Sequence, residues 1–166
     1  MKKGALLVLF FCALAGLAVW INPEDPAASG KVEVDYPCQA EDAWEYPVRP
    51  GTEEWIALES LENRREACRV PQEALEAMDT AALLETALDY PFCLDMLAFD
   101  NAESGYRYQL THNTALAALQ ERTDRQEVVQ GRLEDMGAWL DEVGRTRSAG
   151  AALQYDYLLI FAQYME

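Results

Sequence analysis

Residues 123–143 have the sequence TDRQEVVQGRLEDMGAWLDEV, which predicts the clearest amphipathic helix of the chain. Its apolar residues recur at spacings of four, three, four and three: Val129, Leu133, Met136, Leu140 and Val143. Side chains at these spacings share one face of an α-helix, so this stripe is expected to face a core. Thr123 and Gln126 fit the two ends of a capping box, which predicts where the helix begins. The pattern lasts only about two heptads, so it indicates packing inside a domain rather than a coiled coil.

Helix signals continue on both sides of this segment. The other predicted helices begin with an N-cap candidate or a proline: Thr52, Ser60, Pro71, Asp79 or Thr80, Asp100, and Asn113 or Thr114. A closing helix over residues 151–165 has an inner side made of Leu153, Tyr157, Ile160, Phe161 and Tyr164. Residues 94–99 are apolar enough to be buried in either a helix or a loop. We therefore expect residues 52–166 to form an all-α domain, either an irregular multi-helix bundle or a short stack of helical hairpins.

The amino-terminal residues 1–21 predict export. Lys2 and Lys3 precede an uncharged apolar run, Ala5–Ile21. A basic head, an apolar centre and small residues near the end are typical of a signal peptide, with Ala18 as one cleavage position. An uncleaved membrane anchor is the alternative, because the run is at the short end of what spans a bilayer. In either case we expect the rest of the chain to be secreted or held at the cell envelope, touching the membrane only through this segment if it stays uncleaved.

Residues 22–51 contain five of the seven prolines and predict an extended linker in front of the helical domain. Four aromatic residues lie in this segment or directly after it: Tyr36, Trp44, Tyr46 and Trp55. Packing of the linker onto the domain is the expected role of these side chains. The alternative is an aromatic-lined groove that binds a glycan.

Three cysteines follow the export segment: Cys38, Cys68 and Cys93. An odd number allows at most one internal disulfide among them. Cys38 is the first candidate for such a bond, because its segment has little core of its own. Cys68 and Cys93 lie in apolar surroundings, where a free cysteine is commonly buried as a small hydrophobic residue.

The net charge of −16 restricts the partners of this protein. Nucleic acids and anionic lipid surfaces are themselves polyanions, so we expect neither to bind. A single histidine, His112, excludes a metal site built from several histidines. The acidic residues show no calcium-loop spacing, and no glycine-rich phosphate loop is present in the sequence. We therefore expect no cofactor and no metal ion.

Catalytic signals in the sequence are weak. No serine or cysteine stands in a nucleophile turn, and His112 is expected to be a solvated or capping residue. Paired carboxylates could still serve a small hydrolase of glycan or peptide, with candidates on the predicted 123–143 helix: Glu134, Asp135, Asp141 and Glu142. We expect these acids to face water, opposite the apolar stripe, so the sequence favours a protein without enzymatic activity.

Several short motifs between residues 46 and 100 carry a resemblance. They are YPVRPGTEEW at 46–55, EACRVP at 66–71, LET at 84–86, YP at 90–91 and DMLAFD at 95–100. This stretch resembles an uncharacterised family of exported helical proteins from Gram-positive gut and soil bacteria. The resemblance implies export and a helical fold, and it implies no catalytic residue. We therefore expect an exported, non-enzymatic interaction or structural module at the bacterial surface. Its partner would be a protein, and the net negative charge of this chain favours a partner with a basic surface or helix.

Overall fold

The computed structural model describes residues 36–37 and 40–165, and within them it confirms the predicted all-α fold. The predicted export segment, most of the predicted linker and Cys38 lie outside the described residues. Within the described part of the chain, no helix is long and apolar enough to cross a bilayer. The helices are α1 (Glu53–Ala57), α2 (Leu61–Ala67), α3 (Gln72–Ala77), α4 (Thr80–Leu88), the 3-10 helix η1 (Cys93–Ala98), α5 (Ala102–His112), α6 (Thr114–Gln120), α7 (Arg125–Val143), the 3-10 helix η2 (Arg145–Arg147) and α8 (Ala149–Tyr164).

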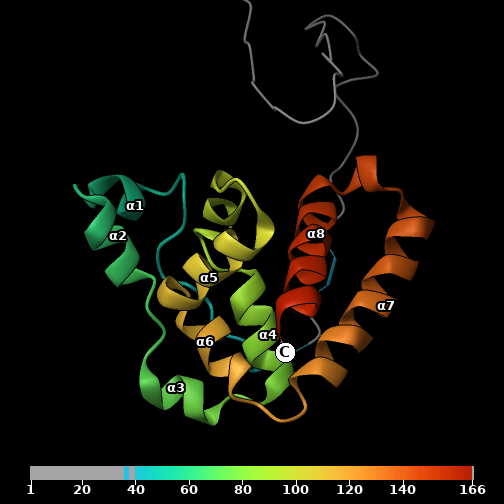
Figure 1. The fold of residues 1–166 in the computed structure, drawn as a ribbon. Helices are drawn as coiled ribbons and strands as arrows, with labels where there is room; N and C mark the ends of the chain where they lie inside the picture. Colours follow the sequence, from blue (N-terminus) through green and yellow to red (C-terminus); the bar gives the residue numbers. More distant parts are fainter. Residues whose placement is uncertain (1–35, 38–39, 166) are drawn as a thin grey trace, which may run out of the picture. The chain divides into compact units, whose positions relative to one another are not determined.

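Helix α4 forms the centre of the domain (Figure 1). It packs against α6, α7 and α8, and its residues from Ala82 to Leu88 are buried on every side of the helix. A helix surrounded in this way must satisfy its polar side chains internally. Glu85 does so with Arg132 of α7, through hydrogen bonds of 2.5 Å and 3.1 Å to the guanidinium group.

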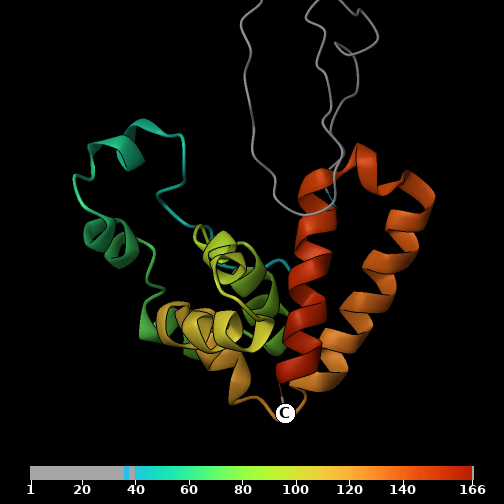
Figure 2. The same ribbon diagram turned by 45° about the horizontal axis from the view of Figure 1, so that its top comes forward.

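Helices α7 and α8 pack as an antiparallel pair at one side of the domain (Figure 2). The stripe predicted on α7 faces inward, with Val129, Leu133, Met136 and Leu140 buried and Val143 half-buried. Helix α8 contributes the buried residues Tyr157, Leu158 and Phe161, while the other residues predicted for its inner side are half-buried: Leu153, Ile160 and Tyr164. Gly144 ends α7 with φ of 89°, a positive value that favours glycine.

Four of the predicted helix starts are correct. The side chains of Thr52, Ser60, Asp79 and Asn113 each accept a hydrogen bond from a backbone N–H in the first turn of the following helix. Pro71 lies one position earlier than predicted, at the N-cap of α3.

Two predicted caps are wrong. Asn101, not Asp100, caps α5, because the Asn101 side chain accepts a hydrogen bond from the Ser104 N–H. The capping box at Thr123 does not form, and α7 begins after Asp124 with no side-chain cap. The Asp124 carboxylate instead accepts a hydrogen bond from the Thr80 hydroxyl at 2.7 Å, so a tertiary contact replaces the local one.

Helices α1 and α2 stand apart from the central helices at the other side of the domain (Figures 1 and 2). Individual side-chain contacts, rather than helix–helix packing, connect α1 and α2 to the rest of the domain. The ring of Trp55 lies 5.1 Å from the ring of Phe92, and Arg65 of α2 forms an ion pair of 2.7 Å with Asp95 of η1. This attachment leaves a groove between α2 and the carboxyl end of α5.

Candidate functional site

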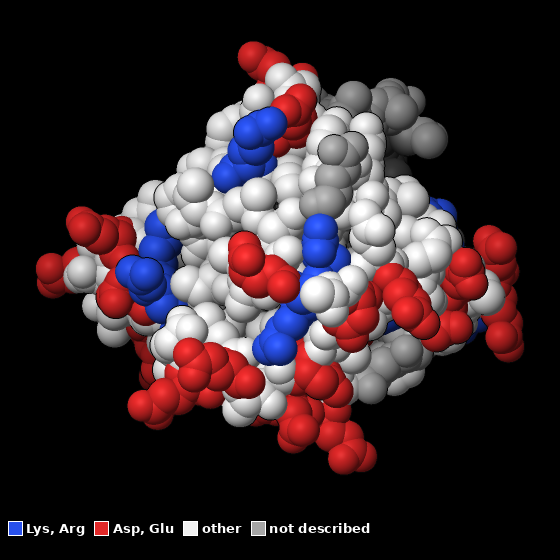
Figure 3. Space-filling model, turned by 60° about the horizontal axis from the view of Figure 1, so that its bottom comes forward, with Lys and Arg blue, Asp and Glu red and all other residues white. Residues whose placement is uncertain are grey.

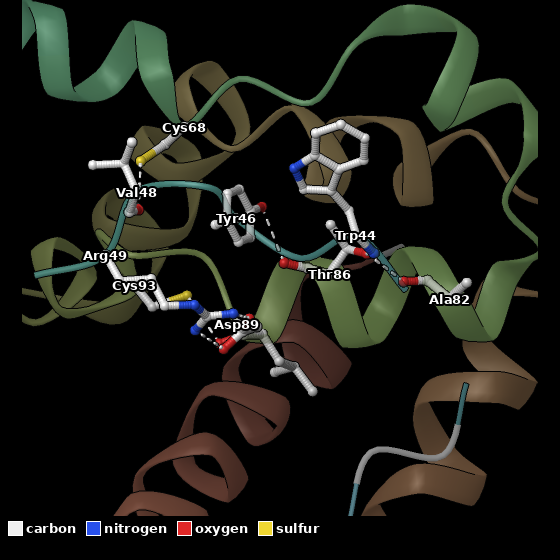
Figure 4. Close-up of polar contacts among 10 residues, drawn as sticks. Trp44, Tyr46, Val48, Arg49, Cys68, Ala82, Thr86, Asp89 and Cys93 are labelled. Carbon is white, nitrogen blue, oxygen red and sulfur yellow. Dashed lines mark hydrogen bonds and ion pairs between the residues drawn. The ribbon is translucent and has the colours of Figure 1, made fainter. Parts of the chain in front are cut away.

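The segment from Ala40 to Thr52 crosses α4 as an extended strap (Figure 4). The backbone N–H of Trp44 donates to the Thr86 hydroxyl at 2.9 Å, and the hydroxyl of Tyr46 donates to the Thr86 carbonyl oxygen at 3.1 Å. Burial raises the pKa of Tyr46 well above its ordinary value, so this hydroxyl remains a donor. The described part of the predicted linker is therefore packed against the core.

Cys68 and Cys93 are free, buried thiols near this strap (Figure 4). The Cys68 thiol lies 3.8 Å from the carbonyl oxygen of Val48, and the Cys93 thiol lies 3.3 Å from that of Ala87. Burial raises the pKa of Cys68 to about 11 and that of Cys93 further. Both groups are therefore neutral and poor nucleophiles near neutral pH.

The four aromatic residues singled out in the sequence pack onto the helical domain. Tyr36 places its ring 4.0 Å from the guanidinium of Arg132 and at right angles to the ring of Trp139. Trp44 and Tyr46 belong to the strap over α4, whereas Trp55 packs beside Phe92. Ring contacts through Tyr90 and Phe92 connect Tyr46 to Trp55.

A groove between α2 and α5 has a volume of about 580 Å³. Helix α2 forms one wall, and the end of α5 with the start of α6 forms the other. The lining residues are Leu61, Glu62, Arg65, Glu66, Arg69, Tyr108, Thr111, His112 and Thr114. A hollow of this size can accept side chains of a partner.

Stacked planar groups form the rigid centre of the groove. The guanidinium of Arg65 lies 5.3 Å from the ring centres of both Phe92 and Tyr108. The Tyr108 ring also stacks on the imidazole of His112, at 4.2 Å. His112 Nδ1 also lies 2.9 Å from the Tyr108 carbonyl oxygen, which holds the imidazole against its own helix. His112 therefore acts as a wall of the groove.

Helix η1 presents an apolar ridge beside this groove, which we define as Leu94, Leu97 and Phe99. A 3-10 helix has three residues per turn, so residues three apart lie in one row. Cys93 and Met96 form the buried row, whereas Leu94 and Leu97 form the next row and are 60% and 53% exposed. The prediction that residues 94–99 are buried is therefore wrong for most of them.

Two contacts connect η1 and the residue after it to the groove wall. The ring of Phe99, which is 39% exposed, lies 4.9 Å from the ring of Tyr108 in the groove wall. Asp95, on η1 between the two ridge leucines, forms the ion pair with Arg65 of the groove. Leu61, 55% exposed, adds an apolar side chain on the α2 side. The sequence analysis did not identify Leu61, Leu94 or Leu97 as surface residues. For the two ridge leucines, the three-residue spacing that starts at Cys93 was the available signal.

The carboxylates considered for hydrolysis lie elsewhere. Glu134, Asp135, Asp141 and Glu142 are all exposed on α7, and none of them lines the groove. Among the described residues, no group of three or more acidic, histidine or cysteine side chains has the geometry to hold a metal ion. The groove lining is mostly charged and polar, whereas the ridge beside it is apolar.

No protein-family model, curated protein sequence or solved structure matches this chain.

Proposed function

We propose that this protein is an exported, non-enzymatic interaction module of the bacterial cell surface, and that it docks a protein partner on the apolar ridge and the adjoining groove. The observation that carries the docking proposal is the ridge itself. Three large apolar side chains within six consecutive residues are left at the surface although the same short helix buries Cys93 and Met96. Clustered exposed apolar side chains beside a hollow are typical of interaction sites.

The available energy fits a docking role. Burying a fully exposed leucine side chain contributes about 1.5–3 kcal/mol, and the ridge leucines, 60% and 53% exposed, offer about half of that each. The ridge is also held in a fixed position. Gln109 of α5 donates hydrogen bonds to the carbonyl oxygens of Phe92 and Cys93 at 2.8 Å and 3.4 Å. A rigid apolar surface loses little conformational entropy when a partner covers it.

Export is the second part of the proposal, and the amino-terminal segment supports it. The basic head and the apolar run Ala5–Ile21 are typical of a signal peptide or an anchor. The resemblance between residues 46 and 100 to exported helical proteins points the same way. The docking face would then meet a partner outside the cytoplasm, secreted with the protein or held in the envelope.

Capture from an envelope extract tests this function when it is combined with variants. The full-length chain, carried in phosphatidylcholine nanodiscs, is immobilised as the native protein, as L94S/L97S and as L159S. Leu159 is the matched control, because it is an exposed leucine, 47% accessible, on α8. We expect a protein that is retained by the native chain and by L159S and lost with L94S/L97S. If the three chains retain the same set of proteins, the docking proposal is wrong.

A further inference from the structure

We infer that the occupant of the apolar ridge and groove is a basic amphipathic segment of another protein. This inference rests on the proposed docking function and names the chemistry of its partner. We call the apolar ridge and the groove together the docking face, or the face. Two features of the described residues support the inference: the charges around this face and the spacing of the ridge leucines.

Three arginines around the ridge and groove are paired with the protein's own carboxylates, whereas Arg64 of α2 forms no ion pair with a described residue and donates to the Trp55 carbonyl oxygen at 3.1 Å. Arg65 pairs with Asp95 at 2.7 Å, and Arg107 pairs with Glu103 at 2.8 Å. A third pair, between Arg69 and Glu66, is longer, at 3.4 Å.

Two carboxylates of the face remain without such a partner. Glu62, in the groove lining, and Asp100, directly after the ridge, form no ion pair with any described residue. Two unpaired carboxylates against one unpaired arginine, Arg64, leave the ridge and groove with a small negative excess. A partner that supplies lysine or arginine beside its apolar side chains complements this excess.

The charge of the whole chain disfavours the other occupants. A second copy of this protein would bring another net charge of −16 to the interface, and an anionic membrane would also be repelled. Figure 3 shows one face of the molecule on which Asp and Glu side chains project around much of the edge, with fewer Lys and Arg side chains between them. A basic segment is instead attracted over a distance of about 10 Å at moderate ionic strength.

The ridge spacing suits a helical partner. Leu94 and Leu97 are separated by one turn of a 3-10 helix, about 6 Å along its axis. One turn of an α-helix rises about 5.4 Å, so apolar residues one turn apart on a partner helix can lie along the two leucines. The polar face of such a helix can then carry lysines that pair with Glu62 and Asp100.

Synthetic peptides test the inference directly. The probes are a helical leucine–lysine amphipathic peptide, the same peptide with glutamate in place of lysine, and a leucine–lysine peptide with scrambled order. Binding to the full-length chain in phosphatidylcholine nanodiscs is measured by fluorescence anisotropy. We expect the amphipathic lysine peptide to bind at least about tenfold more tightly than either of the others. Its affinity should fall at higher salt, because salt screens the attraction between the peptide lysines and the carboxylates of Glu62 and Asp100.

Variants assign this binding to the face. The L94S/L97S variant is expected to bind the lysine peptide about tenfold more weakly, whereas L159S should bind it with an affinity within about twofold of the native value. E62Q and D100N each replace a negatively charged carboxylate with a neutral amide of nearly the same shape. Each variant is expected to bind the lysine peptide about twofold to fivefold more weakly at low salt. Circular dichroism of every variant establishes that the helices are retained.

The outcomes separate the partner's chemistry from the docking function. Equal binding of the glutamate peptide, or no effect of E62Q and D100N, overturns the basic partner but leaves the docking function if L94S/L97S still weakens binding. Two further results also overturn it: self-association that L94S/L97S abolishes, and binding to phosphatidylglycerol vesicles that the same variant abolishes. If L94S/L97S changes neither peptide binding nor capture from the extract, both proposals are wrong.

Discussion

Replacement of Gly105 by alanine should separate η1 from α5. Gly105 is buried in the first half of α5, where the backbone of Met96 in η1 passes directly over it. A Cβ atom at this position would lie 2.9 Å from Met96 Cγ and closer still to the Met96 carbonyl oxygen. The carbonyl oxygen cannot rotate away as a side chain would, so the whole of η1 must shift.

The magnitude follows from two opposing terms. Alanine is favoured over glycine inside a helix by about 1 kcal/mol. Overpacking a well-filled core costs about 1–3 kcal/mol, and contact with backbone belongs at the upper end. We therefore expect Gly105→Ala to lower the free energy of unfolding by about 2 kcal/mol. Gly131→Ala is the matched control, because Gly131 is also inside a helix but has nothing within 4 Å of the added Cβ. It should raise the free energy of unfolding by about 1 kcal/mol.

Urea unfolding of the full-length chain, followed by far-ultraviolet circular dichroism, measures both changes. Equal slopes of free energy against urea for the three proteins would allow direct comparison. Gly105→Ala should also lower the affinity for the amphipathic lysine peptide, because it displaces the apolar ridge. Gly131→Ala should leave this affinity unchanged. The reasoning is refuted if Gly105→Ala is as stable as the native protein, or is stabilised as much as Gly131→Ala.

Three other perturbations follow from contacts of the described residues. Asn101→Ala removes the cap of α5 and should cost about 1 kcal/mol in urea unfolding; an unchanged midpoint would argue against this cap. Glu85→Ala leaves Arg132 buried without its ion-pair partner and should lower the free energy of unfolding by about 3–5 kcal/mol, whereas a loss below about 1 kcal/mol would contradict the buried pair. Burial raises the pKa of Cys68 from 9.0 to about 11, so its thiolate forms only in more alkaline solution. Its alkylation rate, followed by mass spectrometry of the Cys68 peptide, should be slow at neutral pH and still rise between pH 9 and pH 11; a rate that levels off near pH 9 would show an accessible, ordinary thiol.

The parts of the fold governed by local signals could be predicted from the sequence. The apolar stripe of α7 predicted the face that packs, because burial of one helix face requires that spacing. Ser60 and Asp79 marked the helix starts for a similarly local reason: a short polar side chain there can bind the free N–H groups of the first turn.

Features decided by tertiary contacts could not be predicted in the same way. Asp124 was expected beside a capping Thr123, but its carboxylate binds Thr80, which is far away in the sequence. Burial of the strap likewise depends on Thr86 offering both its hydroxyl and its carbonyl oxygen. Nothing in the local sequence around Trp44 indicates that partner.

The candidate site shows the same limit. Residues 94–99 are uniformly apolar apart from Asp95, so composition predicted burial. Only the choice of a 3-10 helix, which separates the row of Met96 from that of Leu97, exposes one row and buries the other. Gly105 packs against η1 and Gln109 donates to the carbonyl oxygens at its amino end, contacts that the local sequence does not indicate.

Photo-crosslinking in the producing cells tests the central claim most directly. A photoreactive residue replaces Leu97 in one strain and Leu159 in the other, and the crosslinked peptides are sequenced by mass spectrometry. We predict that position 97 alone traps a segment of another protein with apolar residues one helical turn apart and lysine or arginine beside them. A crosslink to a second copy of the chain, to an acidic segment, or at both positions equally would contradict the account.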